Sequence, residues 1–269
     1  MKEKLRKFLR PRLAVLLAAA LLAASLPAGV LPSAYAVDIE LVPAETWEDA
    51  VSGEFTENGT ALTSYTCYGS DGSAETVTVD HEAELGSREN PISIPDEASL
   101  ILFGKLKNTE DKYYILDKSG GVYDMQGDTR SMLPLMGTCE SNGTPDMPSG
   151  SLSFQGTLIG NGAKIQNACI KAPNGNWTHP GLFGCLKNAE VMDLTVSLTF
   201  AKQDNYSCYA GGIAAAARGD SSLQRLTVDL TVAENSVYKS VSGLVGGGSG
   251  ITLTGCTAEV GGSLTVTGL

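Results

Sequence analysis

Residues 181–200 read GLFGCLKNAEVMDLTVSLTF, and this stretch decides the fold. The stretch starts with a four-residue segment bounded by glycines, GLFG. A run follows in which apolar and polar residues alternate, as they do in a strand with one buried face. The start recurs at Gly212 and at Gly243, so its copies are 31 residues apart. A fixed period of this length is typical of stacked units that bury their apolar faces only against one another.

A second short pattern follows each start after 13 or 14 residues. It reads LTV at 194–196 and at 226–228, and CTA at 256–258. Val and Leu at period two, with Gly at the corners, indicate a coil of strands rather than a pair of helices. We therefore expect an all-β array whose successive coils lie about 4.8 Å apart, the ordinary distance between paired strands.

The N-terminus predicts export. Six basic residues up to Arg12 precede an apolar run from Leu13 to about Ala24, and residues 34–36 (AYA) supply the small-x-small pattern of a signal peptidase site. The apolar run is short for a membrane span, which needs about 20 residues. We interpret residues 1–36 as a signal peptide and expect a secreted or cell-surface protein with no membrane span in the mature chain.

The charge of the chain narrows the classes of partner. The signal holds six of the 19 Lys and Arg residues and one of the 30 acidic residues, so the remaining chain has 13 basic and 29 acidic residues and a formal net charge of −16. Such a surface repels phosphate backbones, which argues against nucleic-acid binding. It is compatible with Ca²⁺, but a solvated surface accounts for it more simply.

The six cysteines do not indicate a metal or redox motif. They are unevenly spaced and no C-x-x-C occurs, so the pattern predicts neither a zinc ribbon nor a thioredoxin-type pair. Disulfides and buried thiols both remain open.

The rest of the chain divides into two predicted regions. Residues 37–86 are acidic and rich in Thr and Ser, with alternating runs at 37–42 and 75–79, and we interpret them as a small β-rich leader or linker. Residues 87–269 hold the array. Near its start, Pro95 and two acidic residues open a predicted helix whose apolar face extends to Leu106. The chain ends in strand character at Leu269 without a cap, so we expect a fragment or a truncated reading frame.

Several segments before the repeats occur in a characteristic order. They are NPISI (90–94), EASL (97–100), YYIL (113–116) and FQGTLIGNGAKI (154–165). With the G-L-x-G cores at 181–184 and 243–246, they make the chain from about Gly86 onward resemble the GLUG-motif proteins, exported bacterial repeat proteins of the pectate-lyase-like type. The resemblance implies a right-handed parallel β-helix, or solenoid, with a short N-terminal capping helix after the leader. It also implies an adhesin-like surface protein rather than one defined activity.

The resemblance gives the repeat cores a structural role. The residues concerned are Gly181, Leu182, Phe183, Gly184, Gly212, Ile213, Gly243, Leu244, Val245 and Gly246. The middle copy departs from the motif, because Ala215 stands where the other two copies have Gly184 and Gly246.

An enzyme of the β-helix type, a polysaccharide lyase or glycoside hydrolase acting on acidic glycans, is the alternative. Glycoside hydrolysis needs two facing carboxylates. The candidates are Asp193, Asp229, Glu234 and Glu259, with Arg218 and Arg225. No two of these carboxylates lie within three residues of each other, and stacked coils would pair Asp193 with Arg225 at the surface. We therefore assign no catalytic residue.

Neither histidine predicts a metal site. His81 opens HEAEL (81–85), which begins like the zinc motif H-E-x-x-H but has Leu85 in place of the second ligand. His179 lies in a loop beside Trp177 and is expected to be exposed. We predict no cofactor and no metal.

Aromatic side chains offer a candidate glycan contact. Trp177, Tyr206 and Tyr209 would stand on loops along one side of the array, where they could stack on sugar rings. Scattered surface aromatics are common and account for these residues more simply. The predicted function is a non-catalytic, secreted or cell-surface β-solenoid that serves as an adhesin-like binding or structural module of a larger surface protein. Its expected partners are host or environmental glycans or surface proteins.

Overall fold

The structure is a computed structural model that describes residues 62–104, 109–118, 121–125, 153–170, 180–200 and 207–266. The described residues belong to one compact unit of the chain. The predicted signal peptide at 1–36, the first part of the predicted leader at 37–61, and the side chains of Trp177, His179 and Tyr206 lie outside the described residues.

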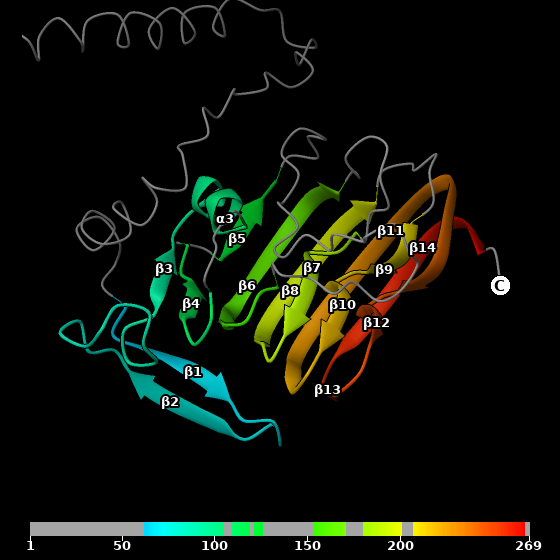
Figure 1. Cartoon of the computed structure of the whole chain (residues 1–269). Helices are drawn as coiled ribbons and strands as arrows, with labels where there is room; N and C mark the ends of the chain where they lie inside the picture. Colours follow the sequence, from blue (N-terminus) through cyan, green and yellow to red (C-terminus); the bar gives the residue numbers. More distant parts are fainter. Residues whose placement is uncertain are drawn as a thin grey trace, which may run out of the picture. The chain divides into compact units, whose positions relative to one another are not determined.

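The described chain is all-β apart from one short helix, and its strands pair in parallel except in one hairpin (Figure 1). This confirms the predicted class. The elements are β1 (Ser64–Tyr68), β2 (Ala74–Thr78), β3 (Ile92–Ile94), α3 (Glu97–Phe103), β4 (Tyr113–Leu116), β5 (Val122–Asp124), β6 (Thr157–Ile170), β7 (Phe183–Lys187), β8 (Glu190–Phe200), β9 (Ser207–Gly211), β10 (Ala214–Arg218), β11 (Ser221–Ser242), β12 (Val245–Gly248), β13 (Ile251–Thr254) and β14 (Thr257–Val266).

The first strands of the three repeats form one parallel sheet, in the order β12-β10-β7. Phe183 is in register with Ala214, and Ala214 with Val245, so each step along the ladder is one 31-residue period. The register matches the spacing read from the sequence. Ala215 does not disturb it, because Ala214 and Ala216 keep their partners on both sides.

The later strands of the repeats belong to a second, larger parallel sheet, whose path runs β13-β11-β8-β6-β4-β3 with β14 also paired to β11. Thr195, Thr227 and Thr257, the middle residues of the three triplets, occupy the same row. In Figure 1 these strands run side by side through the green, yellow, orange and red parts of the ribbon.

The core is formed by the inward-facing side chains of the strands. Along each strand these apolar residues alternate with polar residues that face outward. Leu194, Leu198 and Leu230 are at most 2% exposed, as are Val196 and Val228. Removing one such side chain from water stabilises the fold by about 1.5–3 kcal/mol. Period two therefore decides which face of each strand is buried, since successive side chains point to opposite faces.

At the residue directly before each triplet, the backbone enters the left-handed region and the chain bends. These residues are Asp193 in β8 (φ 53°), Arg225 in β11 (φ 51°) and Gly255 between β13 and β14 (φ 63°). They divide the larger sheet into a first part, around Met192, and a second part, which begins with the triplets. Because the chain bends there, the outer face of the first part, which the hairpin β1–β2 covers, and the outer face of the second part are separate surfaces.

The predicted helix is present as α3, Glu97–Phe103, and Leu106, the last residue of its predicted apolar face, lies outside the described residues. Asp96 caps it, because its Oδ1 accepts a hydrogen bond from the Ser99 N–H at 2.7 Å. Phe103 packs against Tyr114 and Phe154, with ring centroids 4.8 and 5.7 Å away. This aromatic group fills the core beside α3.

The antiparallel hairpin β1–β2 lies on the outer face of the first part of the larger sheet. Tyr65, Cys67 and Val77 share a buried cluster with Ile115, Ile159 and Met192. At the turn of the hairpin, Thr254 Oγ1 donates a hydrogen bond to the Ser70 carbonyl at 3.0 Å. The described end of the leader region, residues 62–86, is therefore packed on the strands of the array.

Candidate functional site

The glycines that open the repeats lie at tight contacts, within one repeat or between neighbouring repeats. A Cβ on Gly212 would be 2.3 Å from the Gly243 carbonyl oxygen, and one on Gly243 would be 2.3 Å from Ala258 Cβ. At Gly181 it would meet the Gly211 carbonyl oxygen at 2.8 Å. These distances leave no room for a side chain, so the glycines have a packing role.

The apolar residues of the repeat cores are more exposed in the last copy than in the first two. Leu182 is 5% exposed, and Phe183 and Ile213 at most 1%. Leu244 and Val245, in the last copy, are only half-buried. Gly184 lies inside β7 and Gly246 inside β12, where a Cβ on Gly246 would be 2.7 Å from the Ala210 backbone.

A polar surface is formed by the outward side chains of the second part of the larger sheet. We call it the polar face and define it as Thr195, Ser197, Thr199, Thr227, Asp229, Thr231, Thr257 and Glu259. Its members on β11 and β14 are exposed, and those on β8 are half-buried. On β8 and β11 they point outward because the residues between them fill the core.

The polar face repeats in two directions. Thr195, Thr227 and Thr257 form one row across the strands, and Thr257 Oγ1 donates a hydrogen bond to Thr227 Oγ1 at 3.4 Å. Neighbouring members of one row lie about 4.8 Å apart, and successive rows along the strands are about 6.6 Å apart. The result is a regular grid of hydroxyl groups.

Two carboxylates stand side by side on the polar face. Asp229 is in register with Glu259 on the neighbouring strand and with Ser197 on the other side. Both carboxylates are exposed. At the far margin, the exposed Lys164 of β6 is in register with Thr195. The polar face is therefore negative toward β14 and positive toward β6.

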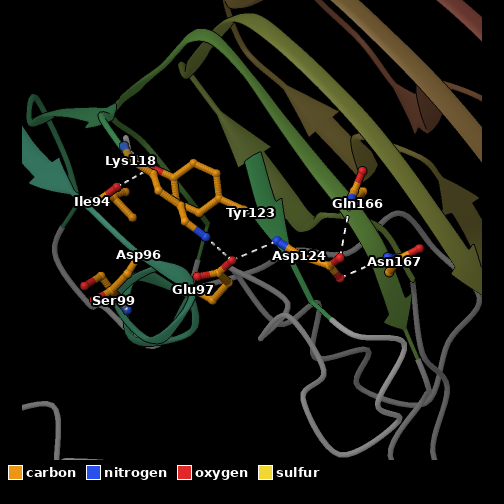
Figure 2. A network of polar contacts seen from close by, with 9 residues as sticks. All are labelled: Ile94, Asp96, Glu97, Ser99, Lys118, Tyr123, Asp124, Gln166 and Asn167. Atoms are coloured by element: carbon orange, nitrogen blue, oxygen red, sulfur yellow. Dashed lines mark hydrogen bonds and ion pairs between the residues drawn. The ribbon is translucent and has the colours of Figure 1, made fainter. Parts of the chain in front are cut away.

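A network of polar contacts continues the polar surface on β5 and β6 (Figure 2). The Asp124 carboxylate accepts hydrogen bonds from Gln166 Nε2 at 3.1 Å and from Asn167 Nδ2 at 2.9 Å. The Asp124 N–H donates to Glu97 Oε1 at 2.9 Å, and Glu97 also forms an ion pair with Lys118. The network thereby ties α3 to β5.

Glu97 is the charged centre of this network. Partial burial raises the pKa of its carboxyl, but the Lys118 ammonium and the Asp124 N–H outweigh that effect and hold the pKa below its ordinary value. Tyr123 lies next to it, donates its hydroxyl hydrogen to the Ile94 carbonyl and accepts a bond from the Lys118 N–H. These groups are occupied with one another, so the network has a structural role.

Two of the six residues named for the enzyme alternative, Asp193 and Arg225, form a surface pair. Arg225 Nε lies 3.4 Å from Asp193 Oδ1, as predicted from their equivalent positions. The Arg225 guanidinium also stacks over the Tyr68 ring, with its central carbon 4.5 Å from the ring centroid. The arginine side chain is 52% exposed.

A second group of ionisable side chains lies beneath the hairpin. Burial raises the pKa of the Glu190 carboxyl, and the nearby Arg88 opposes this rise. Arg88 forms an ion pair with Glu75, and its carbonyl accepts a hydrogen bond from the Tyr65 hydroxyl. Burial also raises the pKa of the Cys67 thiol. These groups join the hairpin to the sheet.

The predicted aromatic contacts are only partly described. Tyr209 lies in β9, is half-buried and is in register with Ser240 of β11. The side chains of Trp177 and Tyr206 are outside the described residues, so the candidate glycan platform stays a prediction. In the part of the chain that the structure describes, no group of three or more His, Cys, Asp or Glu side chains could hold a metal ion.

The polar face was missed in the sequence analysis, although its signal is present. Thr, Ser, Asp and Glu alternate with Leu and Val after each triplet start, as in LTVSLTF and LTVDLTV. The inward half of this alternation predicts the core, and its outward half, taken across the repeats, corresponds to the polar face.

Comparisons with protein families, with curated proteins and with solved structures found no match for this chain. Among the described residues, none of the helical segments has the length and hydropathy of a membrane span.

Proposed function

We propose that this chain is a secreted or cell-surface, non-catalytic binding module whose strands coil as a right-handed parallel β-helix, with α3 as its N-terminal cap. The parallel sheets and their register at the repeat period support the coil. Right-handed crossovers are the rule for parallel strands of one sheet. The place of α3 beside the first strands supports its role as a cap.

The observation that carries the binding function is the polar face. It presents a regular grid of hydroxyls and carboxylates with no apolar member, which suits a ligand that itself repeats hydrogen-bonding groups. An extended polysaccharide on a host or environmental surface has this chemistry. Its hydroxyls can donate to Asp229 and Glu259 and exchange hydrogen bonds with Thr227. We therefore propose glycans as the ligand class.

The GLUG-motif resemblance and the adhesin-like role belong to the same proposal. The tight contacts at Gly212 and Gly246 give the motif a physical purpose, because only Gly fits where adjacent coils touch, and Gly243 has an equally tight contact with Ala258 of its own coil. A module of this kind would serve as one part of a larger surface protein.

The binding function is tested by retention on polysaccharides. Purified chain is passed over immobilised acidic, neutral and amino polysaccharides, and the fraction retained is compared with that of the triple variant Thr227→Val, Asp229→Asn, Glu259→Gln. A hydrogen bond to a charged group is worth about 1.5–3 kcal/mol, so loss of each carboxylate contact weakens binding by about tenfold or more.

The matched control is Glu82→Gln with Glu89→Gln, which removes the same charge from two exposed residues away from the polar face. It should bind as the wild-type chain does. If the wild-type chain is retained on none of the polysaccharides, or if the triple variant binds equally well, the polar face is not the binding surface.

One observation favours the enzyme alternative. Asp229 and Glu259 are neighbours in register, and retaining glycosidases place their two carboxyl groups about 5–5.5 Å apart. However, both are exposed on an open sheet face, whereas an acid catalyst is usually set in surroundings that raise its pKa. Release of reducing ends or unsaturated products, abolished in Glu259→Gln, would establish the alternative and refute a non-catalytic module.

A further inference from the structure

The hairpin β1–β2 lies as a strap across the outer face of the first part of the larger sheet. Its three buried side chains share one cluster with a residue each of β4, β6 and β8. Beyond them, the tip of the hairpin reaches β11 and β13, where Tyr68 meets Arg225 and Ser70 meets Thr254. The strap therefore crosses five neighbouring strands of the sheet.

The two ends of the strap are held unequally. At its base the chain continues from β2 toward β3, and the Tyr113 N–H donates a hydrogen bond to the Gly86 carbonyl at 2.9 Å. Toward the tip, the Tyr68 N–H donates to Met192 Sδ at 3.4 Å, and a thioether is a weak acceptor. The contacts of the tip with β11 and β13 lie at the surface. The strap can therefore pivot about its base.

The face beneath the strap includes a polar side chain that is not fully satisfied there. Gln224 is 1% exposed, and its Nε2 donates to Ser222 Oγ at 2.9 Å, but its Oε1 accepts no hydrogen bond from the described residues. Gln224 is in register with Met192 on one side and with Thr254 on the other, and the strap contacts both of these residues. A buried polar atom without a partner costs free energy that contact with water would recover. Lifting the strap therefore removes a cost.

Glu190 is the ionisable group of β8 beneath the strap. Burial raises the pKa of its carboxyl, and the nearby Arg88, which opposes this rise, is already paired with Glu75 of β2. The Cys67 thiol of β1 and the Tyr113 hydroxyl of β4 interact with the same carboxyl. Burial raises the pKa of both groups, so both are neutral at neutral pH.

The remaining neighbours of Glu190 add no charge. Its partners in register are Thr157 of β6 and Ser222 of β11. Because the carboxyl holds its proton more strongly under the strap than in water, a low pH favours the closed strap. That advantage is lost as the pH rises from 4.5, the ordinary pKa of a glutamate, through the raised pKa of Glu190.

We propose that the hairpin β1–β2 is a pH-sensitive strap, which is closed while Glu190 is protonated and opens about its base when Glu190 is ionised. Opening returns Glu190 and the Gln224 amide oxygen to water, and it uncovers an outer face that is separate from the polar face. The array stays coiled, because its strands pair with one another and not with the hairpin. The buried side chains of the hairpin oppose opening, so the open form is a minor population that grows with pH.

The Cys67 thiol reports the opening, because it is 6% exposed while the strap is closed. The full chain is labelled with a dithiodipyridine, which reacts with thiols in acid as well as at neutral pH, and mass spectrometry gives the rate at each cysteine. Each rate is divided by the rate for the unfolded chain at the same pH, which removes the effect of thiol ionisation. Cys185 of β7 is the internal control, because it is fully buried within the array and only unfolding of the array exposes it.

The corrected rate at Cys67 in the wild-type chain should rise by about tenfold between pH 4.5 and about pH 8. Glu190→Gln, which keeps the shape of the protonated acid, should remove this rise. The matched control Glu259→Gln removes an exposed carboxylate of the polar face and should retain it. Gln224→Met removes the unpaired oxygen at nearly the same volume and should lower the rate at every pH.

Three results would overturn the proposal. A Cys67 that reacts no faster than Cys185 would show that the hairpin separates only when the whole fold opens. A corrected rate at Cys67 that does not change with pH would show that no ionisation controls the strap. A rise that persists in Glu190→Gln would show that another group controls it.

Discussion

Gly212→Ala adds one methyl group at the point where two coils touch, and it should destabilise the protein strongly. The new Cβ would lie 2.3 Å from the Gly243 carbonyl oxygen and 2.5 Å from Val228 Cγ1. The first is a backbone atom and the second belongs to a side chain that is 1% exposed, so neither can move away cheaply. The coils must therefore separate locally.

The magnitude follows from what that separation disturbs. Overpacking a core costs about 1–3 kcal/mol. The Gly212 N–H donates to the Ser242 carbonyl at 3.2 Å, and the Leu182 N–H donates to the Gly212 carbonyl at 3.3 Å. Each of these bonds contributes about 1 kcal/mol. We expect a total loss of about 3–5 kcal/mol in the free energy of unfolding.

The assay is urea denaturation followed by far-ultraviolet circular dichroism, with thermal unfolding as a second measure. A loss of this size lowers the Tm by roughly 10 °C in a domain of 150–250 residues. Gly261→Ala is the matched control, since nothing lies within 4 Å of a Cβ at that position. It should change the stability by less than about 0.5 kcal/mol.

The reasoning would be refuted by a Gly212→Ala variant as stable as the wild-type chain. Equal destabilisation by Gly212→Ala and Gly261→Ala would also refute it, because the effect would then come from glycine itself rather than from the contact between coils.

Three further predictions concern ionisable groups. Glu190 has a raised pKa in the folded chain, so its charge costs stability at pH 7; Glu190→Gln should raise the Tm at pH 7, and the gain should vanish as the pH falls through the folded pKa toward 4.5 in a pH series of thermal melts. Glu97 has a lowered pKa, so its contribution is present above pH 4.5 and is lost as the pH falls below it; Glu97→Gln should cost about 1–2 kcal/mol at neutral pH and much less in acid, and a variant insensitive to pH would contradict the role of Lys118. Arg225→Ala breaks an exposed ion pair and one ring contact, and denaturation should detect a loss of no more than about 1 kcal/mol, so a loss of several kcal/mol would show that the pair is more than a surface contact.

The opposite pH dependences expected for Glu190 and Glu97 come from their surroundings. Both are partly buried glutamates at the start of an element. Glu97 has an ammonium and a backbone N–H directed at its carboxylate, whereas Glu190 has lost water under the hairpin with only Arg88 nearby, and that arginine is already paired with Glu75. No property of the residue type predicts this difference.

Much of the array could be predicted from local patterns. The period of 31 residues set the register of β7, β10 and β12, and alternation after each triplet identified Leu194, Val196 and Leu198 as core. The equivalent positions of Asp193 and Arg225 predicted their ion pair. The start of α3 followed from Pro95 and the acidic residues after it. In each case the sequence pattern that makes the prediction lies within one repeat or compares two positions one repeat apart.

The sequence by itself determined which residues face inward, because the side chains of a strand alternate between its two faces. It also determined which repeats are neighbours, because repeats of one period bury their apolar faces against one another. The tertiary structure alone decided two further features. It placed the hairpin β1–β2 across strands far away in the chain, with Tyr68 beside Arg225 and Ser70 beside Thr254. It also left Val260 exposed at a core position. These features depend on which strands become neighbours, and a pattern within one strand does not hold that information.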